Sequence, residues 1–93
     1  MYHIYMMASK KGGAIYIGVT SNLIKRAYEH KTSATFGFTE RYKAYRLVYF
    51  ESYQDINDAI LREKKLKHYK REWKIELIEK ENPEWNDLYQ KLF

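Results

Sequence analysis

A carboxylate interrupts the apolar face of a helix that the sequence predicts over residues 55–69. At about 100° per residue, that face is formed by four apolar side chains: Ile56, Ala59, Ile60 and Leu66. Glu63 falls near the middle of this face. A buried carboxylate is costly unless it is paired with a cation or binds a metal. Periodicity therefore leaves two interpretations of Glu63: an ion pair, with Lys67 or with an arginine elsewhere, and a metal ligand.

Two short tyrosine motifs near the start of the chain lie on segments that predict a β-hairpin. The motifs are His3-Ile4-Tyr5 and Tyr16-Ile17-Gly18. Residues 2–7 and 14–19 are rich in strand-forming side chains, and the Ser-Lys-Lys-Gly-Gly run between them favours a turn. The sequence therefore predicts two adjacent antiparallel strands, each carrying one of the motifs.

The register of this hairpin decides whether the two tyrosines meet. If Ala8 and Gly13 close the loop, Tyr5 lies directly opposite Tyr16 and the two side chains share one face. The other face then carries the apolar residues of a core: Ile4, Met6, Ile15, Ile17 and Val19. A slip of one residue would separate the tyrosines. Both tyrosines also fit a simpler role as half-buried strand aromatics.

A helix is predicted over residues 22–33, after the capping cluster Thr20-Ser21-Asn22. Its apolar stripe consists of four residues: Leu23, Ile24, Ala27 and Tyr28. Arg26 and His30 are four residues apart, which places them one turn apart on one border of the stripe. We therefore expect both polar side chains to lie beside the buried face of this helix.

The remaining segments complete an α+β fold with a small three-stranded antiparallel sheet. The predicted elements are strands at about 2–7, 14–19 and 45–51, and helices at about 22–33, 55–69 and 72–81. In the last helix we expect Trp73, Leu77 and Ile78 to face inward. A loop is expected over residues 33–44, and the tail after Pro83 is expected to pack back as a turn or helix. This order of elements predicts a single domain over residues 1–93.

The 93-residue chain is basic and has no cysteine. Its 17 basic and 12 acidic side chains give a formal net charge of +5, which suits polyanion binding without identifying a ligand. The lack of cysteine excludes disulfides and thiolate metal sites, and the three histidines lack the spacing of zinc ligands. No stretch is typical of a signal peptide or a membrane span. We therefore expect a cytoplasmic protein with no membrane partner.

In their order along the chain, the motifs resemble the GIY-YIG endonuclease superfamily, and in particular its small single-domain bacterial members, the UPF0213 or YhbQ-like group. The resemblance covers nearly the whole chain. It is carried by Tyr5, Tyr16-Ile17-Gly18, Thr20-Ser21-Asn22-Leu23, Arg26, His30, Arg62-Glu63-Lys64 and Asn82-Pro83-Glu84-Trp85. Each motif is weakly specific alone, whereas their shared order and spacing are specific. His3 departs from the pattern, because it occupies the place of the first glycine in the name motif.

This resemblance implies a DNA endonuclease that uses one divalent metal ion, Mg²⁺ or Mn²⁺. Carried over by position, Glu63 would be the metal ligand and Arg26 would hold the scissile phosphate. Tyr5 and Tyr16 would flank the attacking water, with Tyr16 the favoured general base and Tyr5 its partner. His30 would bond to a tyrosine hydroxyl or to the phosphate.

Four more residues are expected to serve substrate binding: Gly18, Lys64, Lys67 and Asn82. Gly18 would let substrate or backbone come close. Asn82 would support the site, although a helix-ending turn explains this residue equally well. Lys64 and Lys67 belong to a basic run from Arg62 to Arg71, which is either a solvated helix face or a track for a DNA backbone.

Two other functions fit the same sequence: a nucleic-acid-binding module that has lost turnover, and a structural or partner-binding domain. The intact Tyr5, Tyr16, Arg26 and Glu63 favour the enzyme. Many nucleases of the resembled type carry a separate DNA-binding domain, for which 93 residues leave no room. DNA affinity is therefore expected to depend on branched or damaged DNA, on a protein partner, or on a homodimer.

Overall fold

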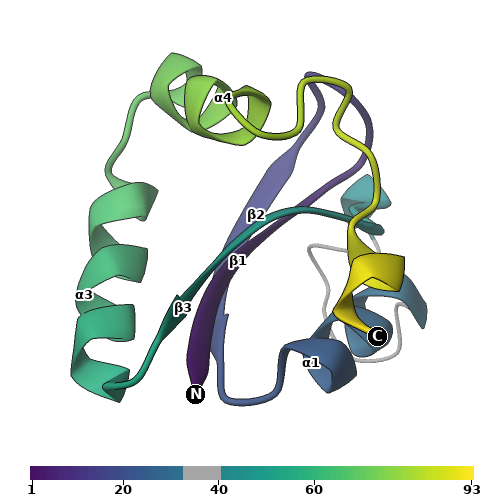
Figure 1. Ribbon diagram of the computed structural model, residues 1–93. Helices are drawn as coiled ribbons and strands as arrows, with labels where there is room; N and C mark the ends of the chain where they lie inside the picture. The colour runs from purple at the N-terminus through teal and green to yellow at the C-terminus, as the bar shows by residue number, and fades with distance from the viewer. Residues whose placement is uncertain (33–40) are drawn as a thin grey trace.

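The computed structural model describes residues 1–32 and 41–93. Its strands are β1 (Tyr2–Ala8), β2 (Ile15–Thr20) and β3 (Arg46–Tyr53), and its helices include α1 (Leu23–Thr32), α3 (Ile56–Lys67) and α4 (Arg71–Glu79). The strands form an antiparallel sheet in the order β2-β1-β3. Figure 1 shows α3 and α4 at the left and top of this sheet, and α1 with the C-terminus at the lower right. The predicted α+β class is confirmed, and these elements begin and end within two residues of their predicted bounds.

The register of the β1–β2 hairpin differs from the predicted one by two residues. Tyr5 pairs with Gly18, and Met7 pairs with Tyr16. The prediction that Tyr5 lies directly opposite Tyr16 is therefore wrong, because the loop extends to residue 14 instead of closing at Gly13. A slip of two residues keeps each side chain on its own face. Tyr5 and Tyr16 are thus diagonal neighbours on one face of the sheet.

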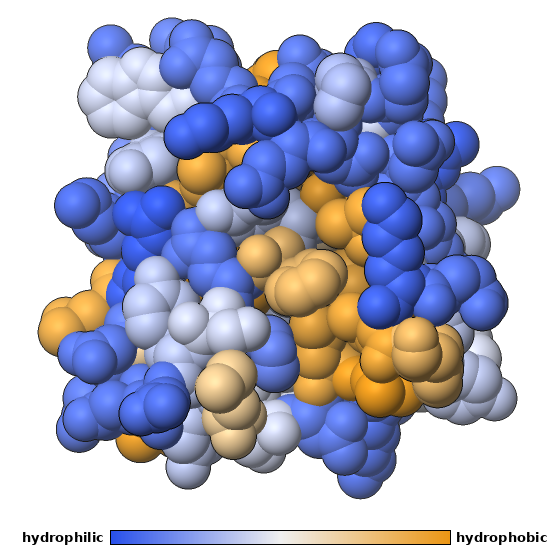
Figure 2. Space-filling model, viewed as in Figure 1, coloured by the Kyte–Doolittle hydropathy of each residue, from blue (hydrophilic) through white to orange (hydrophobic). Residues whose placement is uncertain are grey.

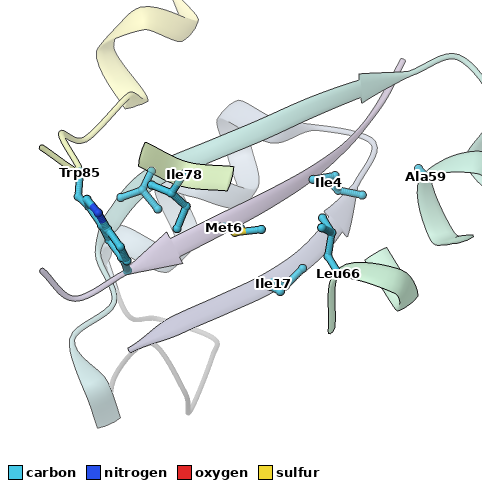
Figure 3. Packing of buried hydrophobic residues seen from close by; sticks show 9 residues of the cluster. Ile4, Met6, Ile17, Ala59, Leu66, Ile78 and Trp85 are labelled. Atoms are coloured by element: carbon cyan, nitrogen blue, oxygen red, sulfur yellow. The ribbon is translucent and has the colours of Figure 1, made fainter. Parts of the chain in front are cut away.

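The two faces of the sheet support separate cores. On one face, strand residues pack against α3, α4 and the C-terminal segment, as Figure 3 shows with Ile4, Met6, Ile17, Ala59, Leu66, Ile78 and Trp85. On the other face, Tyr5 and Met7 pack against Leu23 and Ala27 of α1. The tyrosine motifs therefore face α1, and Glu63 belongs to a helix that packs on the opposite face.

Helix α1 begins after Asn22, whose Oδ1 accepts a hydrogen bond from the Lys25 N–H at 3.1 Å. This confirms the predicted capping cluster. The predicted stripe is only half right, because Ile24 and Tyr28 are 39% and 57% exposed. His30 instead joins the buried face and has no exposed surface. The face of α1 that packs on the sheet therefore differs from the predicted one, and it includes His30.

Helix α3 begins after Asp55, whose Oδ1 accepts a hydrogen bond from the Asn57 N–H at 2.8 Å. Ala59 and Leu66 are its buried residues, whereas Ile56, which was predicted to be part of the apolar face, is 44% exposed. Its two flanks meet different strands. Arg62 reaches Glu51 of β3, and Ile60 borders Val19 of β2.

Helix α4 buries Ile78 and half-buries Leu77, but leaves Trp73 48% exposed. The prediction that Trp73 faces inward is therefore wrong. The large aromatic side chain of this core is Trp85, which is fully buried and donates its Nε1–H to Glu79 at 2.7 Å. The tail ends in the one-turn 3₁₀ helix η1 (Tyr89–Leu92), as predicted.

The loop predicted over residues 33–44 lies mostly outside the described residues, which resume at Arg41. Arg41 and Tyr42 are helical, so the loop prediction is wrong for these two positions. Within the described part of the chain, no helix is both long enough and apolar enough to cross a membrane.

Candidate functional site

A buried hydrogen bond joins β1 to α1 at the centre of the candidate site. The Tyr5 hydroxyl and His30 Nε2 are 2.8 Å apart, and neither residue has exposed surface. The two rings are tilted by 58°, with centroids 5.5 Å apart. His30 reaches Tyr5 because it shares a helix face with Leu23 and Ala27, which pack against β1 and fix the orientation of α1.

Gly18 provides the space that the Tyr5 ring occupies. A Cβ atom at position 18 would lie 2.5 Å from the Tyr5 hydroxyl oxygen and 2.6 Å from Cζ. Real Cβ atoms do not approach other atoms so closely, so any other residue here would displace the ring. The group that comes close to Gly18 in this structure is therefore the Tyr5 ring, from the neighbouring strand of the same sheet. A role for Gly18 in substrate binding stays a prediction.

Tyr16 completes a cluster of three rings. Its centroid is 4.9 Å from that of His30 and 6.2 Å from that of Tyr5. Because β2 is an edge strand, Tyr16 is only half-buried, whereas Tyr5 on the central strand is fully buried. Of the two tyrosines, Tyr16 is thus the one that solvent or a substrate can reach.

The environment assigns different protonation states to the buried pair. Burial raises the pKa of Tyr5 well above its ordinary value, and the neighbouring Tyr16 adds to this effect, while the Arg26 guanidinium opposes it. Burial also lowers the pKa of His30 to about 4, helped by the positive charge of Arg26. At neutral pH, Tyr5 is therefore a protonated phenol and His30 a neutral imidazole.

Arg26 lies at the junction of two surface depressions beside the ring cluster. One has a volume of about 290 Å³ and is lined by Thr20, Ser21, Asn22, Lys25, Arg26 and Glu29. The other, of about 220 Å³, is lined by Tyr2, Val19, Thr20, Ser21, Arg26, Ile56 and Ile60. Arg26 Nε forms an ion pair with Glu29 Oε1 at 3.3 Å, with both side chains about one-third exposed. Such a partly exposed pair is weak, so an incoming phosphate can compete for the guanidinium.

Glu63 lies outside the ring cluster, on α3. Its side chain is only 15% exposed, and its Oε1 pairs with Lys67 Nζ at 3.5 Å. An ion pair with Lys67 was one of the two interpretations of Glu63 that the helical periodicity allowed. Ile60, one turn earlier on α3, shares a depression with Arg26, and residues three apart lie on the same side of a helix. Glu63 therefore faces the β2 edge, on the side of α3 that approaches Arg26.

The donor chemistry at Glu63 fits a hard divalent cation with a water-rich shell. No group of three or more His, Cys, Asp or Glu side chains that could hold a metal occurs among residues 1–32 and 41–93. Mg²⁺ keeps most of its waters and is often held by one or two carboxylates together with substrate phosphates. A single carboxylate at Glu63 is compatible with that mode.

The other predicted binding residues occupy different environments. Lys64 is exposed, and Lys67 is half exposed beside Glu63. Asn82 is 6% exposed, and its side-chain NH₂ donates to the carbonyls of Val48 at 3.1 Å and Asn86 at 2.9 Å. In this structure Asn82 ties the segment after α4 to β3. The binding roles of Lys64, Lys67 and Asn82 stay predictions.

A polar network beside Glu63 was missed by sequence reasoning. Arg62 donates to both carboxylate oxygens of Glu51 at 3.0 and 3.1 Å. The hydroxyls of Tyr49 and Tyr53 also donate to that carboxylate, the latter at 2.7 Å. Burial alone would raise the pKa of Glu51, but the bonds from Arg62 and the two tyrosines outweigh it and lower the pKa. The alternation of Tyr49, Glu51 and Tyr53 on one strand was the only signal for this network.

His3, which departs from the name motif, packs at the end of the same sheet face. Its ring meets that of Phe50 edge-on, with centroids 6.1 Å apart. Among the described residues, its buried Nδ1 has no hydrogen-bond partner. Burial, followed by the positive N-terminus, lowers the pKa of His3. His3 is therefore a neutral, half-buried neighbour of the site at neutral pH.

Comparisons with known proteins identify the family of this chain. A family model described as the GIY-YIG catalytic domain matches residues 1–82. Similar sequences include UPF0213 proteins of Staphylococcus saprophyticus (29% identity over 83% of this chain and 93% of the relative), Haloquadratum walsbyi (30%, 84% and 88%) and Pediococcus pentosaceus (33%, 71% and 70%). A solution NMR structure of a UPF0213 protein from Bacillus halodurans shares the fold, with a TM-score of 0.54 and 24% identity over 88% of this chain and 87% of that one. With a matching domain model over most of its length and UPF0213 proteins as relatives, this chain belongs to the GIY-YIG family.

Proposed function

We propose that the protein is a metal-dependent endonuclease that hydrolyses phosphodiester bonds in DNA. The observation that carries the proposal is the convergence of Tyr5, Tyr16 and His30 beside Arg26. These residues come from two strands and a helix, and only the half-buried tyrosine of the cluster is accessible. Such an arrangement can hold a water molecule and a phosphate next to one another.

Tyr16 is the proposed general base. In its phenolate form, its oxygen would accept a proton from the attacking water. Tyr5 cannot easily take this role, because burial keeps it protonated. Tyr5 and the neutral His30 instead form a fixed pair that holds the Tyr16 ring in place through direct ring contacts.

Arg26 is the proposed phosphate ligand. Its guanidinium lines both depressions at the start of α1 and can exchange its weak pairing with Glu29 for a bidentate contact to phosphate oxygens. Lys25 lines one of these depressions and adds a second positive charge. The N-terminus of α1 contributes a favourable dipole for an anion.

Glu63 is the proposed metal ligand, with Mg²⁺ or Mn²⁺ as the ion. Such an ion would neutralise charge on the phosphate and stabilise the leaving oxygen. For Glu63 to bind it, Lys67 must release the carboxylate oxygen that it now contacts. Lys67 is half exposed and can turn to solvent or to a DNA phosphate, so the exchange needs no change in the backbone.

DNA is the proposed substrate because the chain is basic, with Lys64 and Lys67 close to Glu63 along α3. Contacts from such lysines position a backbone without reading sequence. A domain this small provides little binding surface, so we propose that cleavage favours branched or damaged DNA, or requires a partner or a second copy.

One observation favours an alternative, a DNA-binding module that keeps this fold and does not turn over. In the described residues, Glu63 is satisfied by Lys67, and no further acidic side chain joins it to form a metal cluster. A structural ion pair at this position would hold α3 together without any catalytic role. Cleavage and binding must therefore be measured separately.

The proposed base is tested by removing single hydroxyl groups. Tyr16→Phe is compared with Tyr28→Phe, because Tyr28 is 57% exposed on α1 and outside the ring cluster. Both variants and wild type are assayed with Mg²⁺ or Mn²⁺ on hairpin, flap, nicked and plain duplex DNA. We expect Tyr16→Phe to lose roughly 100-fold or more of the cleavage rate and Tyr28→Phe to match wild type. Equal cleavage by Tyr16→Phe and wild type would remove Tyr16 from the mechanism.

A further inference from the structure

An open groove runs between the end of α3 and the outer face of α4. It has a volume of about 580 Å³ and is lined by Lys65, Tyr69, Trp73, Glu76, Leu77 and Lys80. Figure 2, viewed as Figure 1, shows hydrophilic residues interrupted by residues of intermediate hydropathy over the region of α4 and the upper end of α3. The groove therefore combines aromatic walls with a polar rim.

Trp73 is the main aromatic wall of this groove. It is 48% exposed, whereas Trp85, the only other tryptophan of the chain, is fully buried. Tyr69 meets Trp73 at 90°, with the ring centroids 5.6 Å apart. This edge-to-face contact holds the indole in a fixed orientation. Helix α4 buries Ile78 on its core face, but Trp73 lies outside that face. Its large ring is thus held at the surface.

The rim of the groove is predominantly basic. Lys65 and Lys80 line it, and Lys70 places its Nζ 5.6 Å from the centre of the Trp73 ring. Glu76 is the one acidic residue among the lining side chains of this described region. The groove therefore offers a π-surface with positive charges around it, which complements a ligand that carries flat rings and negative charges.

The groove lies on the opposite flank of α3 from Glu63. Lys65 is two residues after Glu63, which corresponds to about 200° around the helix axis. Arg62, on the same flank as the groove, donates weakly to the Tyr69 hydroxyl at 3.4 Å. The groove is therefore separate from the ring cluster and from the β2 edge, and it can engage a different part of a bound molecule.

We propose that this groove binds unpaired nucleotides of a single-stranded nucleic-acid segment, with a base stacked on Trp73 and backbone phosphates next to Lys65, Lys70 and Lys80. Single-strand binding sites combine a basic groove with aromatic platforms in this way, because every base has a π-face. A purely apolar partner would instead bury the ammonium groups at a cost. The charges of the rim therefore favour a nucleic acid as the occupant.

This binding site goes beyond the proposed cleavage function and does not require it. If both are correct, the groove gives the protein a preference for DNA in which a single strand leaves the duplex near the cut. Binding is therefore measured with Glu63→Ala in the absence of divalent metal, so that loss of cleavage and loss of single-strand binding are separate results.

The first measurement uses the two tryptophans as internal probes. Stacking of a base on Trp73 should quench its fluorescence when an oligothymidylate is titrated, whereas the buried Trp85 should keep its emission. In Trp73→Ala, the remaining Trp85 signal also reports whether the protein is folded. Quenching that follows protein concentration and not oligonucleotide would show that a second copy occupies the groove, and would overturn the proposal.

The second measurement compares affinities for a labelled single strand. Loss of one stacked base costs about 1–3 kcal/mol, or roughly 5- to 150-fold in Kd. Trp73→Ala should weaken binding within this range, Trp73→Tyr should restore most of it, and Tyr28→Ala should match the parent, because Tyr28 is exposed on α1. An unchanged Kd for folded Trp73→Ala, or an equal loss in Tyr28→Ala, would contradict the proposal.

Discussion

The Tyr5 hydroxyl and His30 Nε2 form a 2.8 Å hydrogen bond between two residues that have no exposed surface. Burial holds Tyr5 in its protonated form and His30 in its neutral form, so the bond joins two uncharged groups over the useful pH range. It fixes α1 to the central strand, and with α1 it fixes Arg26. The geometry of the ring cluster therefore depends on a contact that a substrate cannot reach.

Removing the Tyr5 hydroxyl should destabilise the fold. Tyr5→Phe leaves His30 buried without this partner, at a cost of about 1–3 kcal/mol. Urea denaturation measures the change in the free energy of unfolding, and Tyr28→Phe, which removes an exposed hydroxyl, is the control. An unfolding free energy equal to that of wild type would show that the Tyr5–His30 bond contributes nothing to stability.

His30 should make stability depend on pH. A histidine in the unfolded chain has a pKa of about 6.5, whereas burial, followed by Arg26, lowers the pKa of His30 in the fold to about 4. Between these values the unfolded chain binds more protons, so the free energy of unfolding rises from about pH 4 to about pH 6.5 and falls again on acidification. The contribution of His30 is at most about 3 kcal/mol.

Urea denaturation across this pH range tests that contribution, with His30→Gln as the matched variant. The variant should show a flatter increase between pH 4 and 6.5. Some slope should remain, because burial also lowers the pKa of His3. Parallel plots of unfolding free energy against pH for wild type and His30→Gln would mean that His30 has the same pKa in the folded and the unfolded chain.

A methyl group at Gly18 should displace the Tyr5 ring. The added Cβ would lie 2.5 Å from the Tyr5 oxygen, which forces either the ring or the β1–β2 pairing to shift. Overpacking of this kind costs about 1–3 kcal/mol. We expect Gly18→Ala to lose stability and the NMR contacts between the Tyr5 and His30 rings. If the variant keeps both, the close approach at Gly18 is not a constraint on the site.

The Glu51–Arg62 pair should position Glu63. Both side chains are about one-fifth exposed, and Arg62 directly precedes Glu63 on α3. Breaking a buried pair costs about 3–5 kcal/mol, and we expect roughly 2–3 kcal/mol for Glu51→Gln because of this partial exposure. Tyr53→Phe removes one bond to the same carboxylate and should cost about 1 kcal/mol.

The metal response of Glu51→Gln and Arg62→Lys separates a role in positioning Glu63 from a role in stability. Glu51→Gln should need a higher Mn²⁺ concentration than wild type for the same increase in melting temperature. Arg62→Lys, which keeps the positive charge, should need a concentration between those of Glu51→Gln and wild type. Metal response unchanged in folded Glu51→Gln would restrict the network to a structural role.

The faces of the sheet were predictable from the sequence, although the register was not. Alternation with a period of two assigns Tyr5 and Tyr16 to one face and Ile4 and Ile17 to the other, and a slip of two residues leaves this assignment intact. The closing positions of the loop depend on backbone geometry over several glycines and lysines. No local pattern distinguishes closure at residue 13 from closure at residue 15.

Helix orientation was harder to predict, because periodicity does not show which neighbour covers a helix. His30 was expected at the border of α1 and is buried, since Tyr5 supplies a partner from another element. Trp73 was expected inside and is exposed, since Trp85 from the C-terminal segment fills the core in its place. Similarly, Glu51 and Arg62 are joined only when β3 and α3 pack together. Each of these outcomes depends on residues distant in the sequence.

If Glu63 supports metal-dependent DNA cleavage, two glutamate variants should behave differently. Wild type, Glu63→Gln and Glu72→Gln, in which Glu72 is exposed on α4, are purified in parallel and assayed on the same DNA panel with Mg²⁺, Mn²⁺ or a chelator. We expect wild type and Glu72→Gln to cleave DNA only with metal, and Glu63→Gln to cleave no faster with metal than in chelator. Equal cleavage by Glu63→Gln and wild type, or no metal-dependent cleavage by any of the three proteins, would contradict this role of Glu63.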